Sequence, residues 1–272
     1  MIKPIIIANW KANNQTYKIS EKNILETYKG ISKDKERINL LFAPSAVHIS
    51  KLNTSVLKRY KVRYAAQDVS VFENGSHTGE ITAASLKDVG VNLVIVGHSE
   101  RREQGDDDSM IVKKVENALN NKMEVVLCIG EKNRDDNNEY LIHIEKQITN
   151  VFDKIDKSFH KNIIIAYEPI WAINNKNNEF LNSKSLLSMV IFIRKIIHDR
   201  YGQDNSKSIR VLYGGSVNEE NVQDLFWNGE VHGFLVGRSS VESKTLVPMV
   251  KNILINPNKN ILKNYAKKRP RS

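Results

Sequence analysis

Glu168 is the residue of this sequence best suited to accept a proton. It closes the apolar run IIIAYE and is followed by Pro169, Ile170 and Trp171. A carboxylate with apolar neighbours loses hydration, which raises its pKa and makes it a better proton acceptor near neutral pH. A structural carboxylate paired with a lysine or an arginine is the alternative for this position.

His98 and Lys11 could stabilise the negative charge that proton removal creates. His98 follows the apolar run LVIV after one glycine, and Lys11 belongs to the motif NWK, which also holds Asn9. A neutral imidazole that donates to a carbonyl oxygen contributes about 3 kcal/mol in a transition state, and a lysine adds a full positive charge nearby. The commoner fates are a histidine hydrogen-bonded at a strand end and a lysine in solvent.

Two glycine-containing segments are candidates for binding phosphate: YGGSV at 213–217 and LVGRSS at 235–240. Each stands where a strand is expected to give way to a helix, and unpaired N–H groups and the helix dipole favour a dianion there. Glycine at a turn more often serves backbone geometry alone. The order of both segments after Glu168 strengthens the phosphate interpretation.

These polar residues follow short apolar, β-branched runs that predict strands. A longer segment with helical spacing of apolar residues separates most of the runs, which is typical of βα units around a parallel sheet. The length of 272 residues is close to the roughly 250 of one (β/α)8 barrel. We expect an α/β fold, a single-domain (β/α)8 TIM barrel over residues 1–255. The predicted strands are Ile5–Asn9, Leu40–Ala43, Val62–Gln67, Leu93–Gly97, Val125–Ile129, Ile163–Glu168, Arg210–Tyr213 and Gly233–Val236.

The predicted barrel would bring the polar residues together, because the C-terminal ends of its parallel strands share one rim, where active sites of this architecture lie. The outer helices show ordinary core-facing stripes. One consists of Ile111, Val115 and Leu119, preceded by acidic residues 106–108 that would complement the helix dipole. The other consists of Leu186, Val190, Ile193 and Ile197 and ends near Gly202.

The sequence predicts a cytoplasmic protein without a bound metal, because it lacks the patterns of a signal, a membrane span and a metal site. The chain carries a net charge of +10, but residues 256–272 hold six basic and no acidic residues, so the remainder is +4. We read this segment as a solvated basic C-terminal extension, with weak adhesion to acidic partners as the alternative, and expect no nucleic-acid partner. Cys128 is the single cysteine, and no metal-ligand spacing, secretory signal or membrane-length apolar run occurs.

Six motifs together resemble the triosephosphate isomerase family in content, order and spacing. They are NWK at 9–11, VGHSERR at 96–102, CIGE at 128–131, AYEPIWAI at 166–173, YGGSV at 213–217 and GFLVG at 233–237. The similarity runs from about residue 3 to residue 255. It implies an intramolecular oxidoreductase that interconverts dihydroxyacetone phosphate and D-glyceraldehyde 3-phosphate in glycolysis and gluconeogenesis.

The resemblance also implies roles for individual residues. Glu168 would take the substrate proton, and His98, Lys11 and Asn9 would polarise the carbonyl, so that an enediol(ate) forms and is reprotonated on the neighbouring carbon. No cofactor is implied. The phosphate would be held near Ser216, Gly237, Arg238 and the loop residue Asn174, while Ile173 and Leu235 would press on the Glu168 carboxylate when the loop closes.

A homodimer is implied as well. The segment NGSHTGE at 74–80 resembles the interdigitating dimer loop of the family, in which Thr78 would reach Asn9 of the partner subunit and Glu100 of the partner subunit. Asn-Gly is also a turn signal anywhere, so an exposed turn is the alternative. Cys128 matches a family cysteine and is expected to pack as a small hydrophobic residue.

Three features depart from the family pattern. Asn174 and Lys176 stand where the catalytic loop usually has glycines. Arg238 replaces a common glycine, and a positive φ there would cost on the order of 1 kcal/mol. The extension at 256–272 has no counterpart. The rival functions are another phosphate-binding barrel, such as a sugar-phosphate isomerase or a Schiff-base aldolase, and a silent or adhesive protein that acts through the extension.

Overall fold

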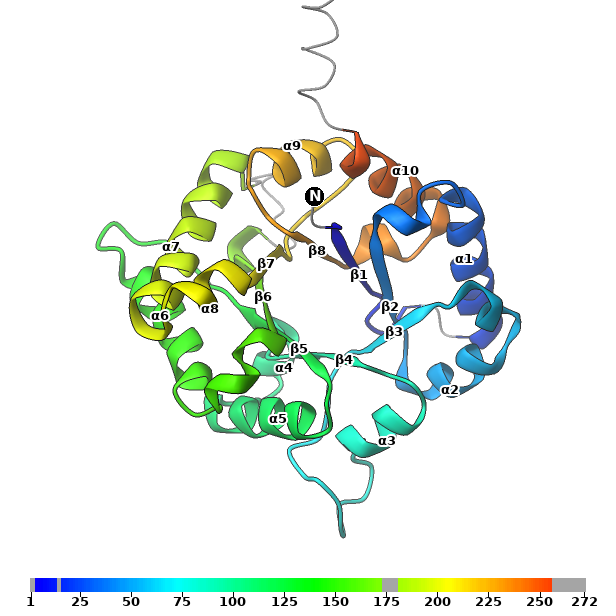
Figure 1. Cartoon of the computed structure of the whole chain (residues 1–272), viewed down its shortest axis with the longest axis horizontal. Coiled ribbons are helices and arrows are strands. Elements are labelled where there is room, and N and C mark those ends of the chain that lie inside the picture. The colour runs from blue at the N-terminus through cyan, green and yellow to red at the C-terminus, as the bar shows by residue number, and fades with distance from the viewer. Residues whose placement is uncertain (1–2, 14–15, 173–180, 256–272) are drawn as a thin grey trace, which may run out of the picture.

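The computed structural model describes residues 3–13, 16–172 and 181–255. Every strand within them pairs in parallel with the next along the chain, and the first pairs with the last, so that the sheet closes into a barrel. Figure 1 shows the strands as an inner ring with helices around it. The strands are β1 (Ile5–Asn9), β2 (Asn39–Ala43), β3 (Arg63–Ala66), β4 (Leu93–Val96), β5 (Glu124–Ile129), β6 (Ile163–Tyr167), β7 (Arg210–Tyr213) and β8 (Gly233–Val236).

The predicted (β/α)8 barrel is confirmed, and each predicted strand agrees with the structure to within one residue at either end. The helices are α1 (Tyr17–Gly30), α2 (Ala46–Thr54), α3 (Ala83–Asp88), α4 (Ser99–Glu103), α5 (Asp108–Asn120), α6 (Glu139–Phe152), α7 (Ser183–Tyr201), α8 (Gln203–Ser208), α9 (Val222–Trp227) and α10 (Ser243–Leu254). The predicted extension at 256–272 lies outside the described residues.

The core has two layers because successive strand residues point to opposite faces of the sheet, and both faces are buried. One layer fills the barrel interior and includes Ile7, Ile95, Ile164 and Leu212. The other lies between the strands and the helices. Cys128 is buried in the interior layer, as expected for a small hydrophobic residue.

The two predicted helix stripes are buried in α5 and α7. Gly202 follows α7 with φ of 90°, a conformation that glycine adopts without strain. Asp107 caps α5, accepting from the N–H of Met110, and Asp108 lies in its first turn. Asp106 differs from the expectation: its carboxylate forms an ion pair with Lys114, so it serves packing between elements more than the helix dipole.

Candidate active site

Asn9 and Lys11 lie where β1 ends at the C-terminal rim. Lys11 has φ of 51°, in the left-handed region that costs a lysine of order 1 kcal/mol or more. Its backbone is held there by two side chains: Asn9 Oδ1 accepts from its N–H at 3.2 Å, and Gln67 Nε2 donates to its carbonyl at 2.8 Å. The Lys11 ammonium is thereby directed to Glu100 Oε1, 2.7 Å away.

His98 follows β4 and caps the N-terminus of α4. Its Nδ1 accepts from the backbone N–H of Glu100 at 3.2 Å. A neutral ring whose Nδ1 accepts must carry its proton on Nε2. Nε2 lies 3.6 Å from Glu168 Oε1, so the proton-bearing nitrogen and the carboxylate face the same small space.

Glu168 continues the path of β6 into the mouth of the barrel, and its backbone N–H donates to Ile129 at 2.7 Å. The residue is 3% exposed. Burial raises the pKa of its carboxyl above the usual range, and the neighbouring His98 and Lys11 oppose part of this rise. A hydrogen bond from the backbone of Ser99, at the start of α4, also favours the charged form of this carboxyl.

Glu168 fits its position because two neighbouring residues are glycines without a side chain. A Cβ at Gly130 would lie 1.8 Å from the Glu168 carbonyl oxygen, and one at Gly214 would lie 2.7 Å from its Cγ. Gly214 belongs to the predicted phosphate segment, so this glycine also sets the position of the candidate base. The motifs CIGE and YGGSV thus contact AYEPIWAI directly.

The two predicted phosphate segments lie side by side at the same rim. Ser239 Oγ donates to the Val217 carbonyl at 2.7 Å, which joins the two segments. A Cβ at Gly237 would lie 3.6 Å from Lys11 Cε, so this backbone adjoins the lysine side chain. Ser216 Oγ donates to the Ala172 carbonyl at 3.1 Å and so ties the segment to the 3₁₀ turn Ile170–Ala172 after β6.

Arg238 begins a 3₁₀ turn, Arg238–Ser240, and its φ is not positive. The strain considered for a positive φ at this position therefore does not arise. Its side chain is exposed. Leu235 is buried in the barrel interior. The loop residues Ile173, Asn174 and Lys176 lie outside the described residues.

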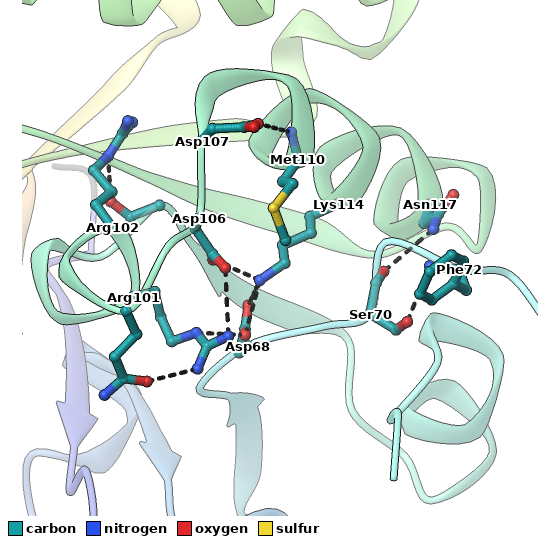
Figure 2. Close-up of polar contacts among 12 residues, drawn as sticks. Asp68, Ser70, Phe72, Arg101, Arg102, Asp106, Asp107, Met110, Lys114 and Asn117 are labelled. Carbon is teal, nitrogen blue, oxygen red and sulfur yellow. Dashed lines mark hydrogen bonds and ion pairs between the residues drawn. The ribbon is translucent and has the colours of Figure 1, made fainter. Parts of the chain in front are cut away.

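An ion cluster built on the buried pair Lys114 and Asp106 holds the segment that carries His98 and Glu100. Figure 2 shows the Lys114 ammonium between the carboxylates of Asp68 and Asp106, at 2.9 and 2.5 Å. Arg101 of α4 lies 2.9 Å from Asp68 Oδ2 and joins the same cluster. Because Asp68 follows β3 and Lys114 belongs to α5, the cluster joins α4 to the end of β3 and to α5.

Sequence reasoning missed the roles of Gln67 and Glu131. Glu131 is 1% exposed and accepts from Tyr167 Oη at 2.8 Å and from Trp171 Nε1 at 2.9 Å. Arg134 also donates to it, at 3.1 Å, so that Glu131 anchors the 3₁₀ turn Ile170–Ala172 that follows β6. Their place in the sequence could have indicated these roles, because Gln67 and Glu131 come just after strands, as Glu168 does.

The fold and the rim site together define an enzyme of the (β/α)8 barrel class. The family described as Triosephosphate isomerase matches residues 4–253. The Triosephosphate isomerase of Wigglesworthia glossinidia brevipalpis is 38% identical over 88% of this chain and 92% of its own. That of Flavobacterium psychrophilum is 35% identical over 92% and 98%, and that of Mycoplasma genitalium 34% over 90% and 97%. The chain belongs to the triosephosphate isomerase family.

The described residues hold neither a candidate metal site nor a helix that could span a membrane. Their histidine, cysteine, aspartate and glutamate side chains form no group of three or more that could hold a metal ion. None of their helices combines the length and the apolar character needed to cross a membrane.

Proposed function

We infer that this protein interconverts dihydroxyacetone phosphate and D-glyceraldehyde 3-phosphate. Membership of the family supports the activity. The single observation that carries the assignment of residues is the pair Glu168 and His98, a buried carboxylate 3.6 Å from an imidazole nitrogen that bears a proton. A base and an electrophile at this separation can act on neighbouring carbon and oxygen atoms of one small molecule.

In this proposal Glu168 removes the proton from the substrate carbon next to the carbonyl. His98 Nε2–H donates to the carbonyl oxygen, and Lys11 and Asn9 stabilise the negative charge that collects there. The C–H electron pair forms the C=C bond while the carbonyl π pair moves onto its oxygen, which gives an enediol(ate). A proton then passes from the neighbouring hydroxyl oxygen to the former carbonyl oxygen. As the new C=O bond forms, the C=C pair takes the proton that Glu168 returns to the neighbouring carbon. Burial supports the role of Glu168, because a raised pKa makes the carboxylate a stronger base.

The phosphate of the substrate is assigned to the rim beside Lys11. The backbones at Ser216, Gly237 and Arg238 supply N–H groups at the ends of β7 and β8, and Asn174 is assigned to the same site by family resemblance. Lys11 supports this placement because its side chain adjoins Gly237 and carries a positive charge. The phosphate and the carbonyl would then lie on either side of one lysine.

The decisive experiment measures triose phosphate interconversion by the purified chain in both directions. We expect turnover without any added metal or cofactor. A Glu168→Gln variant should bind a phosphorylated substrate analogue and lose turnover, because it keeps the shape of the side chain and removes the base. Full turnover by that variant would remove Glu168 from the mechanism, and absence of turnover in the wild type would reject the function.

We further propose a homodimer built on the segment at 74–80. This segment is exposed, and Figure 1 shows the connection between β3 and α3 extending away from the ring of helices. Phe72 is 40% exposed beside it and stacks on His77. Thr78 would contact Asn9 of the partner subunit and Glu100 of the partner subunit, completing the site.

The dimer is tested with Thr78→Arg, which places a bulky charge in the proposed contact. Sedimentation of the wild type should give twice the chain mass of 31.1 kDa. The variant should sediment as a monomer and lose activity together with the dimer. A fully active monomer would contradict the proposed contact.

A role in glycolysis and gluconeogenesis follows from this reaction, and we propose a cytoplasmic location for it. We also propose that residues 1–255 form the catalytic domain and that 256–272 are an extension that the reaction does not need. Activity retained by a chain ending at Ile255 would support this division, and loss of activity in a folded truncated chain would contradict it.

A further inference from the structure

A cavity opens at the end of the barrel opposite the candidate active site. It has a volume of about 320 Å³ and lies where β1, β2 and β3 begin, against the end of α1 and the 3₁₀ turns Lys35–Arg37 and Val56–Tyr60. The strands run in parallel from this end toward the rim that holds Glu168 and His98. The cavity is therefore separate from the candidate active site.

The walls of this cavity are strongly basic. Its charged residues are one acid, Glu36, and five bases, so its net charge is +4. Residues 1–255 as a whole also carry a net charge of +4. The acidic and basic residues of this range outside the cavity therefore cancel. The basic residues are Lys3, Lys35, Arg59, Lys61 and Arg63.

Most of these cations have no acidic partner. Within the described parts of the chain, no carboxylate lies within 4.0 Å of a charged nitrogen of Lys3, Lys35, Arg59 or Lys61. Arg63 approaches Glu124 only at 3.8 Å, and Glu124 already pairs with Arg210 at 2.6 Å. Like charges gathered around one concavity repel each other and create a positive potential that a bound anion would neutralise.

Aromatic rings give the cavity a firm wall. Tyr60 is half-buried, and its ring centre lies 5.7 Å from that of Tyr28. The Arg59 guanidinium lies 5.0 Å from the Tyr60 ring, which restrains a side chain that is otherwise exposed. The buried side chains of Ile31 and Leu40 also line the cavity. The cations are thus arranged around a packed support and not along a loose tail.

We propose that this cavity binds a small polyanion that carries two or more phosphoryl groups. Its volume is at the lower end of the range of small-molecule sites, roughly 300–1,000 Å³, and several cations around so small a space suit a ligand of high charge density. A single phosphate would engage only part of the set. The concave shape selects a compact ligand that one molecule of the protein can enclose.

The test is calorimetric titration of the full chain with inorganic triphosphate at constant ionic strength. We compare Arg59→Glu/Lys61→Glu with the control Lys154→Glu/Lys161→Glu. The control makes the same charge change at exposed lysines near the start of β6, outside the cavity. All three proteins keep the extension at 256–272, so any binding to it is common to them.

We expect wild type and control to bind triphosphate alike, and the cavity variant to bind at least about ten-fold more weakly. Equal binding by the cavity variant and the control would overturn the proposal, as would orthophosphate binding as tight as triphosphate. The double variant Lys3→Glu/Lys35→Glu is a second test of the same cavity and should weaken binding similarly. Retained isomerase activity verifies that each variant is folded.

A parallel titration with ATP tests whether the ligand is a nucleotide or a phosphate chain without a base. Tighter binding of ATP than of triphosphate, lost in Tyr60→Ala, would support a nucleotide whose base packs on the ring. Equal binding would support recognition of the phosphate chain alone. No binding of either compound to the wild type would reject the site while leaving the isomerase assignment intact.

Discussion

The two ends of this barrel use charge in opposite ways. At the C-terminal rim the proposed base and the lysine beside it are buried or paired, Glu168 with His98 and Lys11 with Glu100. At the N-terminal end the cations of the basic cavity, such as Lys3 and Lys61, are exposed and lack acidic partners within the described residues. The same strands supply both ends, and the connecting segments make them different.

This contrast shows what burial contributes to function. An interaction between charges is stronger in a water-poor site than in solvent, and groups held there need no reorganisation when a reaction creates charge. Exposed cations are screened by salt over about 8 Å at physiological ionic strength and suit reversible binding. The rim is therefore arranged for chemistry, and the opposite end for attraction of an anion.

The largest expected effect comes from moving the buried base. Glu168→Asp withdraws the carboxylate by one methylene group, and a misplacement of this size costs about 10²-fold or more in kcat. Substrate affinity should change much less, because the phosphate site is not altered. Steady-state kinetics with both triose phosphates measure the two quantities, and Glu145→Asp on the outer helix α6 is the control. Equal losses in kcat and in affinity would contradict the assignment of Glu168 as the base.

The second prediction concerns the stability that the buried ion pair of Lys114 and Asp106 contributes beside α4. Asp106→Asn removes one partner of the buried Lys114 ammonium and should lower the free energy of unfolding by about 3 kcal/mol. The matched control is Asp34→Asn at the other end, where the partner Arg37 is exposed and the loss should be below about 1 kcal/mol. Urea unfolding of both variants measures the difference. Equal losses would mean that burial does not distinguish the two pairs.

A smaller effect depends on pH and on His232, which lies just before β8 at the N-terminal end. Burial, aided by Arg194, lowers the pKa of His232 to about 4. Above pH 6.5 the ring is neutral in the folded and in the unfolded chain, so its protonation does not reduce the free energy of unfolding. As pH falls below 6.5, the His232 ring becomes protonated in the unfolded chain. In the folded chain it stays neutral until about pH 4. Stability should therefore fall by up to about 2 kcal/mol between pH 6.5 and 5.

The measurement for His232 compares urea unfolding at these two pH values in wild type, His232→Gln and His198→Gln. The first variant should show a shallower loss than the wild type, because it removes the titrating ring. His198 is exposed, so its replacement should leave the wild-type dependence unchanged. A wild-type slope in His232→Gln would contradict the assignment.

The smallest effect tests whether the two ends are electrically independent. Lys161→Glu reverses an exposed charge just before β6 and should change kcat/KM by less than about two-fold. A five-residue strand is about 17 Å long, roughly twice the screening length in physiological salt. Kinetics at low and physiological salt check this, and a large change that persists in salt would contradict the separation of the ends.

Much of the fold and the core of the site could be predicted from local patterns. The apolar runs located each strand to within a residue, and the polar residues after them located Asn9, His98 and Glu168. The contacts of Gln67 with Lys11 and of Glu131 with Trp171 could not be predicted, because each joins segments far apart in the chain. The basic cavity was missed for the same reason, since its cations are scattered between Lys3 and Arg63.

Local patterns in the chain were enough to predict the alternation of strands and helices, the residues that follow each strand and the family. Covalent spacing is enough for these, because strand and helix periodicities are local properties of the chain. The folded barrel was needed to learn what His98 Nδ1 accepts from, how deeply Glu168 is buried and where unpaired cations gather. These properties depend on contacts between residues far apart in the sequence. Such residues meet, and exclude water from one another, only when the barrel closes.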